Sequence, residues 1–446
     1  MLREGKVEGE SLLERIASKK AQVGVLGLGY VGLPLGIAFA EAGFPAFGLD
    51  IDLSKIESLR KGQSYIRHIP SDPIARLVSQ QRLRLSADLS ELSACDAILI
   101  CVPTPLNESR EPDLEYVRSS AAAIAAALRP GQLVVLESTT YPGTTEEVLK
   151  PILETSGLRA GEDFHLAYSP EREDPNNPVF RTGNIPKLVG GLTPACRDAA
   201  VALYRNVIDN VIPVSSTRVA EMAKLLENIY RCVNIALVNE MKILCDRMNT
   251  DVWEVIEAAS TKPFGFHPFY PGPGLGGHCI PVDPFYLTWK ARQHDFTTRF
   301  IELAGEINTN MPHYVVQRTV DALNEDGKSV KGAKLFILGV AYKKDIEDLR
   351  MSPALRVMEL LEDKGAVIQY HDPFVGRADW RHSGHSRTWT GVPLLPEHLR
   401  QADAVLILTD HSSVDYELVG REARLVVDTR NAMKKVTAPK ARIVKA

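Results

Sequence analysis

The sequence predicts an α/β protein with two doubly wound, Rossmann-like domains joined by a long central helix. Three observations lead to this prediction. An apolar strand, a glycine turn and an amphipathic helix follow one another over residues 21–44, and a second alternation of strands and helices begins near residue 333. Between them, residues 217–248 carry apolar side chains at helical spacing without a glycine or proline.

The first domain is expected to span residues 1–205. A short polar helix in residues 1–20 precedes the fold. Helical segments such as residues 113–128 separate the apolar β runs, as in a doubly wound parallel sheet. These runs are Ala46–Asp50, Ala97–Val102, Leu133–Glu137 and His165–Ser169.

Residues 206–320 form the expected central region, in which the long helix bridges two domains and buries a subunit contact. Apolar side chains recur along this helix at Ala220, Leu225, Leu226, Ile229, Val233, Ala236, Leu237, Met241 and Leu244. Residues 262–284 are so rich in glycine and proline that we expect a tight, irregular loop. An irregular loop of this kind costs stability, so it is usually kept because it forms part of a binding or catalytic site.

Residues 321–446 form the expected C-terminal α/β domain. Its strands lie within 333–342, 366–372, 402–410 and 424–431, with a helix over 353–364. Three strand ends, at Asp372, Thr409 and Asp428, lie where doubly wound sheets bind ligands. The sequence therefore predicts a second ligand-binding edge in this domain.

Composition excludes several functional classes. The 446 residues are 45% hydrophobic and 24% charged, with a net charge of -4 and no dense basic stripe, so we expect no nucleic-acid partner. No apolar run is long enough for a signal peptide or a bilayer span, so we expect a cytoplasmic protein without membrane contact. The six cysteines are scattered singly, which predicts neither a disulfide framework nor a metal site.

A dinucleotide fingerprint opens the first domain. Gly27-Leu28-Gly29-Tyr30-Val31-Gly32 follows a strand and begins a helix, so the backbone can approach a pyrophosphate at the helix N-terminus. Asp50 ends the next strand at the spacing of the ribose-binding acid. Because its carboxylate would repel a 2′-phosphate, we expect NAD as the cofactor and not NADP. Lys55 is either a second adenosine contact or a solvated surface lysine.

The glycine-rich loop holds a candidate nucleophile, Cys279. It lies in Gly274-Leu275-Gly276-Gly277-His278-Cys279-Ile280-Pro281-Val282-Asp283, where glycines allow close ligand approach and a carboxylate follows four residues later. A single cysteine is usually a packing residue, but this setting favours a reactive thiol. His278 is expected to be a hydrogen-bonded structural residue, because no partner for a metal site accompanies it.

Two polar residues share one face of the long helix. Lys224 and Asn228 are four residues apart, so an ammonium group and an amide donor could both stabilise a negatively charged oxygen. A solvated polar helix face is the simpler interpretation of the pair alone.

Several motifs together resemble one family. They are the glycine fingerprint, Ser138-Thr139-Thr140-Tyr141-Pro142-Gly143-Thr144, Ser169-Pro170-Glu171, Ala220-Glu221-x-x-Lys224-x-x-x-Asn228 and the Cys279 loop. In this order they are similar to the UDP-glucose/GDP-mannose dehydrogenase family over nearly the whole chain. The loop ending Cys279-Ile280-Pro281-Val282-Asp283-Pro284 resembles the branch that acts on UDP-N-acetylhexosamines.

The resemblance implies a four-electron oxidation of a sugar C6 alcohol with two NAD. It implies that Cys279 captures the aldehyde as a thiohemiacetal, which is oxidised to a thioester and hydrolysed. Lys224 and Asn228 would stabilise the oxyanions, Asp283 would assist deprotonation through water, and Glu171 and Thr139 would lie near the thioester. These roles come from matching positions, and Thr104 and Thr139 are likewise expected to contact the cofactor.

The resemblance also implies a UDP-sugar partner in the C-terminal domain. Lys343 and Arg350, in the segment that begins Tyr342-Lys343-Lys344-Asp345, are expected to pair with its phosphates. Gly276, Glu171, Lys224 and Asn228 complete the expected substrate contacts. The expected sugar is N-acetylglucosamine, for a surface polysaccharide such as an O-antigen, with N-acetylmannosamine, N-acetylgalactosamine and glucose as alternatives.

Two other functional classes compete with this hypothesis. A two-electron dehydrogenase would need no thiol in the glycine loop, and a non-catalytic dinucleotide-binding regulator would need neither Cys279 nor the pair Lys224 and Asn228. The long apolar helix makes a symmetric dimer, or a larger homo-oligomer, the expected assembly.

Overall fold

The computed structural model of the chain describes residues 10–66, 69–107, 111–173, 179–180, 182–277, 279–382 and 384–446. It divides into two compact units. The first contains residues 1–227 and 289–295, and the second contains residues 228–288 and 296–446. One continuous helix, α8 (Thr217–Arg247), belongs to both units, so the predicted long central helix is confirmed.

The first unit is built around an eight-stranded sheet in the order β3-β2-β1-β4-β5-β6-β7-β8. All neighbouring strands are parallel except β6 and β7. The strands are β1 (Val23–Leu26), β2 (Ala46–Leu49), β3 (Leu83–Ser86), β4 (Ala97–Ile100), β5 (Leu133–Leu136), β6 (His165–Tyr168), β7 (Lys187–Gly191) and β8 (Val211–Val214). The central strands β1, β4 and β5 are buried along their whole length, as both faces of a doubly wound sheet require.

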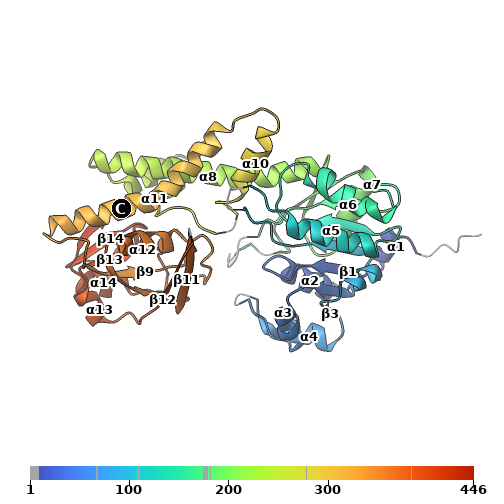
Figure 1. Cartoon of the computed structure of the whole chain (residues 1–446), viewed down its shortest axis with the longest axis horizontal. Helices are drawn as coiled ribbons and strands as arrows, with labels where there is room; N and C mark the ends of the chain where they lie inside the picture. The colour runs from blue at the N-terminus through green and yellow to red at the C-terminus, as the bar shows by residue number, and fades with distance from the viewer. Residues whose placement is uncertain are drawn as a thin grey trace, which may run out of the picture. The chain divides into compact units, whose positions relative to one another are not determined.

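Helices cover this sheet (Figure 1), and side chains cap the start of three of them, α1, α3 and α7. Ser11 and Glu14 form a capping box on α1, and Thr193 caps α7 ahead of Pro194. The helices of this unit are α1 (Leu12–Ala17), α2 (Gly32–Glu41), α3 (Leu53–Arg60), α4 (Ser71–Ser79), α5 (Glu115–Ala127), α6 (Lys150–Leu153) and α7 (Pro194–Tyr204). The strand order around β1 and β4 places the turn after β1 at the point where the chain reverses direction across the sheet, which is where such folds bind ligands.

The second unit contains a five-stranded parallel sheet in the order β10-β9-β13-β14-β15. Its strands are β9 (Lys334–Leu338), β10 (Val367–His371), β13 (Ala404–Ile407), β14 (Leu425–Asp428) and β15 (Arg442–Lys445), with a separate antiparallel hairpin of β11 (Arg377–His382) and β12 (His385–Thr390). The helices are α9 (Val252–Ser260), α10 (Asp283–Arg292), α11 (Arg299–Glu325), α12 (Pro353–Asp363), α13 (Pro396–Gln401) and α14 (Tyr416–Glu422). The end of α10, from Trp289 on, belongs to the first unit. The predicted α/β class with two parallel-sheet domains is therefore confirmed.

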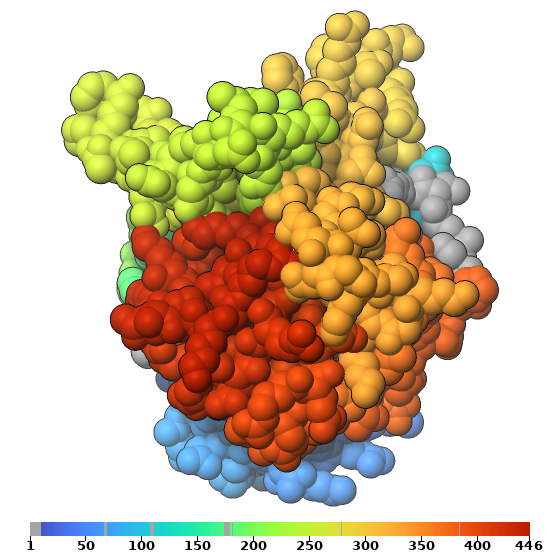
Figure 2. All heavy atoms as spheres, turned by 90° about the vertical axis from the view of Figure 1, so that its left-hand side faces the viewer, coloured from blue at the N-terminus to red at the C-terminus, as the bar shows by residue number. Residues whose placement is uncertain are grey.

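Helix α11 lies on the C-terminal sheet domain and packs against α12 and β14 (Figure 2). Buried apolar side chains at Val315, Val316 and Leu323 join α11 to the core of that domain. Among the described residues, no helix combines the length and the hydropathy that crossing a bilayer requires.

Candidate functional site

The glycine turn after β1 has the geometry of a nucleotide-binding turn. Gly27 has φ +93°, and a Cβ there would lie 2.6 Å from the carbonyl oxygen of Cys101. A Cβ at Gly32 would lie 1.9 Å from the Gly27 carbonyl oxygen, so both positions require glycine. Gly29, by contrast, has nothing within 4 Å of its Cβ position, which leaves open space for a ligand at the N-terminus of α2.

Asp50 follows β2 and faces this turn. Its Oδ2 accepts hydrogen bonds from the Leu28 amide at 2.9 Å and from Lys55 Nζ at 3.1 Å, and its Oδ1 accepts one from the Asp52 amide at 3.0 Å. The structure thus brings Lys55 to the predicted ribose acid. Tyr65 also reaches the turn and donates its hydroxyl to the Leu28 carbonyl, a contact that sequence reasoning missed.

The ends of β4 and β5 bring Thr104 and Thr139 together. The Thr104 hydroxyl donates to the Thr139 carbonyl at 2.7 Å, and the Ser138 hydroxyl donates to the Val102 carbonyl at 2.7 Å. Val31, at the start of α2, lines a cavity in this unit, and Tyr30 packs against the core. Several of the predicted cofactor residues therefore lie on neighbouring strand ends and on the turn after β1.

Lys224 and Glu171 are in contact within the first unit. Lys224 is only 5% exposed, and its ammonium group donates to the Glu171 carbonyl and lies 3.6 Å from Glu171 Oε2. The backbone amide of Glu173 donates to the other carboxylate oxygen, Oε1 of Glu171. Both oxygens of this carboxylate therefore have a neighbouring positive or partly positive group.

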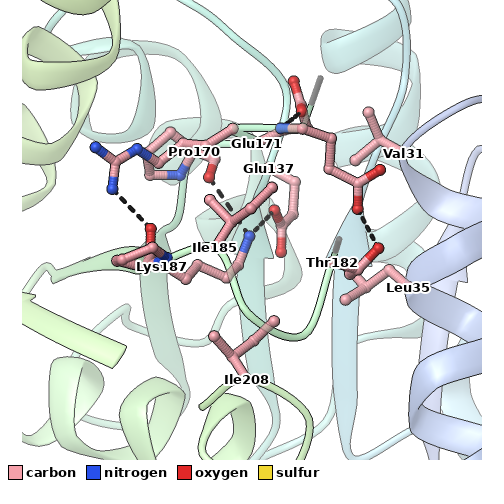
Figure 3. Close-up of a pocket in the computed structure, with 12 residues that line it drawn as sticks. Val31, Leu35, Glu137, Pro170, Glu171, Thr182, Ile185, Lys187 and Ile208 are labelled. Atoms are coloured by element: carbon pink, nitrogen blue, oxygen red, sulfur yellow. Dashed lines mark hydrogen bonds and ion pairs between the residues drawn. The ribbon is translucent and has the colours of Figure 1, made fainter. Parts of the chain in front are cut away.

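Glu171 borders a small cavity of about 30 Å³, large enough for about one water molecule (Figure 3). Glu137 and Lys187 also line the cavity and form a buried ion pair of 2.5 Å. Glu173 also lines the cavity and accepts a hydrogen bond from Thr182. Burial, and then the nearby carboxylates of Glu171 and Glu137, raise the pKa of Glu173 to about 7 despite that hydrogen bond and Lys187.

A separate polar pair lies beside the cysteine loop in the second unit. The Asn228 side-chain amide donates to Asp283 Oδ2 over 2.5 Å, and both residues are buried. The Asp283 amide donates to the Cys279 carbonyl at 2.8 Å, so Cys279 lies in the turn that leads into α10. His278 lies outside the described residues.

The loop that precedes Cys279 lies against the segment between β9 and α12. The Gly277 amide donates to the Arg350 carbonyl at 2.9 Å, and a Cβ at Gly276 would lie 2.5 Å from the Tyr342 Cβ. The Arg350 guanidinium pairs with Asp348 at 2.6 Å, and Lys343 is half-buried in the same segment. Gly276 in the cysteine loop is therefore required for close packing against Tyr342, whether or not a ligand also approaches it.

Glu221 is a further residue that sequence reasoning left without a role. It is completely buried on α8, one turn before Lys224, and accepts hydrogen bonds from the Gly143 amide at 2.6 Å, the Thr145 amide at 2.9 Å and the Thr145 hydroxyl at 2.7 Å. It therefore holds the loop after β5 against α8. The only sequence signal was its place in the motif that contains Lys224.

Three family models cover most of the chain. Residues 21–208 match the NAD-binding domain of the UDP-glucose/GDP-mannose dehydrogenase family, residues 218–310 match its central domain, and residues 336–435 match its UDP-binding domain. The chain belongs to this family. It is an NAD-dependent nucleotide-sugar dehydrogenase, which confirms the predicted family and the predicted cofactor.

Relatives of this dehydrogenase are named for different sugars. It is 36% identical to a UDP-N-acetyl-D-glucosamine 6-dehydrogenase of Pseudomonas aeruginosa over 91% of this chain and 93% of that one. It is 34% identical to an NDP-N-acetyl-D-galactosaminuronic acid dehydrogenase of Ralstonia nicotianae, over 92% and 95% respectively. The solved UDP-D-ManNAc dehydrogenase of Pyrococcus horikoshii superposes with a TM-score of 0.84 at 33% identity, over 95% of this chain and 99% of that one.

Proposed function

We propose that this dehydrogenase oxidises the C6 alcohol of a UDP-N-acetylhexosamine to the carboxylate, for use in a surface polysaccharide. UDP-N-acetyl-D-glucosamine is the substrate we favour, and the N-acetylmannosamine, N-acetylgalactosamine and glucose derivatives are the alternatives. The glucosamine assignment is supported by the relative from Pseudomonas aeruginosa and by the Cys279 loop. Relatives named for N-acetylmannosamine and N-acetylgalactosaminuronic acid have similar sequence identities to this chain, so the experiment below includes the alternative sugars.

The residues of the glycine turn suit NAD. The open space at Gly29 and the N-terminus of α2, where the structure shows no side-chain capping hydrogen bond, suit a pyrophosphate, and Asp50 suits the ribose hydroxyls. When bound, NAD accepts one hydride in each of two oxidation steps. Asp50 must exchange part of its contact with Lys55 or Leu28 for the ribose, because its carboxylate is engaged by both.

Cys279 links the two oxidations in this proposal. Its sulfur adds to the C6 aldehyde, which gives a thiohemiacetal, and loss of the C6 hydride with the hydroxyl proton gives a thioester. Water then attacks the carbonyl carbon, the carbon–sulfur bond breaks, and the acid and the free thiol form. The single observation that carries the proposal is the position of Cys279 at the start of α10, where Asp283 is bonded to Asn228 of α8.

Charged and polar residues have assigned roles in these steps. Lys224 and Asn228 lie one turn apart on α8 and supply the donors that stabilise negative charge on the C6 oxygen. Asp283 accepts a proton through water. Glu171 accepts the proton of the hydrolytic water, and its carboxylate lies 3.6 Å from Lys224. Thr139 is assigned to the surroundings of the thioester, as its matching family position implies.

The experiment that tests this function measures NADH formed per sugar consumed by the purified protein with each of the four UDP-sugars. We expect two NADH per sugar, a uronic acid product, and the highest kcat/KM with UDP-N-acetyl-D-glucosamine. One NADH per sugar, with an aldehyde as product, contradicts the four-electron reaction. A higher kcat/KM with another sugar replaces only the sugar assignment.

We further propose that α8 joins two copies of this chain. Seven large apolar side chains on α8 are at least 36% exposed and recur at helical spacing, namely Val219, Met222, Leu226, Tyr230, Leu237, Met241 and Leu244. A surface stripe of this size on one helix is typical of a symmetric interface. Light scattering at several concentrations tests it, and a monomer at micromolar concentration contradicts it.

A further inference from the structure

The segment between β9 and α12 has an unusual backbone. It runs from Tyr342 to Arg350 and contains Lys343, which the family resemblance implies as a phosphate contact of the proposed UDP-sugar substrate. Asp345 has φ +61° and Met351, directly after the segment, has φ +52°, although neither is a glycine. Left-handed backbone at such residues has a cost and persists only where surrounding contacts hold it.

His411 supplies one of those contacts from the loop after β13. Its side chain is fully buried, and its Nδ1 accepts a hydrogen bond from the Asp345 amide at 2.9 Å. A ring nitrogen that accepts an amide hydrogen carries no proton. Nε2 therefore carries the proton and donates to Asp372 Oδ2, which lies 2.9 Å away.

Asp372, directly after β10, anchors this histidine. Its Oδ2 also accepts the Val340 and Ala341 amides at 2.8 and 3.2 Å, and its Oδ1 accepts the Phe374 and Val375 amides at 2.8 and 3.1 Å. Burial alone would raise the pKa of Asp372, but the hydrogen bond from His411 and these amides hold it below its ordinary value. Asp372 is therefore a charged, fully bonded anchor.

Hydrogen bonds hold the segment of residues 342–350 at two further points. The carboxylate of Asp345 accepts the Ser412 amide at 2.8 Å and the Ser412 hydroxyl at 2.7 Å. At the other end, the Arg350 carbonyl accepts the Gly277 amide of the cysteine loop. The backbone around Lys343 is thus held between the loop after β13 and the loop that carries Cys279.

We propose that His411 is a positioning residue for the nucleotide sugar, which holds the Asp345 amide to Asp372 and so fixes the backbone that presents Lys343 to the diphosphate. The inference rests on the proposed function in one respect, the role of Lys343 in binding the nucleotide. His411 acts through the segment and does not itself contact the ligand. Its imidazole suits this role because one ring supplies an acceptor and a donor on opposite sides.

The test compares binding of UDP by calorimetry in His411→Phe, His411→Asn and the wild type. Phe removes both hydrogen bonds, whereas Asn can supply one acceptor and one donor in their place. We expect the Kd for UDP to rise about tenfold in His411→Phe, as loss of buried hydrogen bonds implies, and to return to within about threefold of wild type in His411→Asn. The KM for NAD should not change in either variant. His398→Phe is the matched control, because His398 lies on α13 and bonds through Nδ1 to the Pro393 carbonyl.

Each outcome decides the proposal. Unchanged UDP binding in a folded His411→Phe overturns it, and so does equally weak binding in His411→Asn. If His411→Phe does not fold, Ser412→Ala decides, since it removes only the exposed hydroxyl contact to Asp345. A rise of about threefold in its Kd supports the proposal, and an unchanged Kd overturns it. A wild type that binds no UDP refutes the proposed function instead, so the two failures are distinguishable.

Discussion

The side-chain amide of Asn228 donates to Asp283 Oδ2 over 2.5 Å and thereby joins α8 to the first residue of α10. Asp283 is 1% exposed, and a buried carboxylate of this kind is costly unless donors surround it. Its backbone amide in turn holds the Cys279 carbonyl. The hydrogen bond between Asn228 and Asp283 therefore fixes the start of α10, the helix that follows the candidate nucleophile. Asn228 makes this bond from α8, the helix that also carries Lys224.

Asn228→Asp should lower kcat and leave NAD binding by the first unit intact. The substitution places two carboxylates within hydrogen-bonding distance, so one must take up a proton or move away. We expect kcat to fall about 100-fold with an unchanged KM for NAD. Steady-state kinetics check this, with Asn234→Asp as control. Asn234 lies on the same helix, and its side-chain amide donates to the Tyr230 carbonyl one turn away. Wild-type kcat in Asn228→Asp would contradict the assigned role.

Asp50→Ala should weaken NAD and partly admit NADP. The substitution removes the ribose acceptor and frees Lys55, which lies 3.1 Å from Asp50 Oδ2, to approach a 2′-phosphate. We expect KM for NAD to rise about tenfold, as the loss of a charged hydrogen bond implies. The double variant with Lys55→Ala should lose the gain with NADP. Equal use of NAD and NADP by the wild type would refute this account of cofactor selection.

Lys224→Ala should lower kcat by roughly 10²–10³, because its charge stabilises a negative oxygen that exists only near the transition state. The KM for the sugar should change much less. Arg231→Ala, which removes an exposed cation on the same helix, is the control. A change confined to KM would make Lys224 a binding residue only.

Glu173 should make stability fall as the pH rises from about 4.5 to about 7. Burial, followed by the carboxylates of Glu171 and Glu137, raises its pKa to about 7 in the folded state. The folded chain therefore binds more protons than the unfolded chain in this window, and stability present below pH 4.5 is lost through pH 7. The loss is up to roughly 3 kcal/mol.

Urea unfolding across this pH range compares the wild type with Glu173→Gln. The variant cannot ionise at this position, so its free energy of unfolding should vary less between pH 4.5 and 7. Thr182→Val keeps the carboxyl but removes its hydrogen-bond donor, and should retain the dependence. Identical slopes in the wild type and Glu173→Gln would show that Glu173 does not titrate in this window.

Local patterns explain which parts of the site could be predicted from sequence. The turn at Gly27 and Gly32 and the acid at Asp50 follow from backbone geometry and strand length, and both lie within one βαβ unit. The helical spacing of Lys224 and Asn228 is equally local. Glu221 and His411 left no such signal, because their partners lie 78 and 66 residues away and a buried polar contact depends on tertiary packing.

The apolar pattern of α8 likewise shows what sequence alone cannot predict. Spacing predicted a helix, but the apolar residues lie on two faces: Leu225 and Ile229 are buried, whereas Leu226 and Leu237 are 63% and 56% exposed. A period of 3.6 residues identifies a helix, and it does not say whether an apolar face packs within the chain or awaits a second copy.

Cys279 as the covalent carrier of the aldehyde is the central claim, and Cys279→Ala tests it most directly. The variant lacks the nucleophile but retains the glycine turn, Lys224 and Asn228, so the first hydride transfer remains possible. NADH and uronic acid are measured together over many turnovers, with Cys279→Ser as a second variant in which mass spectrometry can detect a slowly hydrolysed ester on the peptide. The account predicts that Cys279→Ala makes almost no acid, while the wild type yields two NADH per sugar. Acid formed by Cys279→Ala at the wild-type rate, with two NADH per sugar, would contradict it.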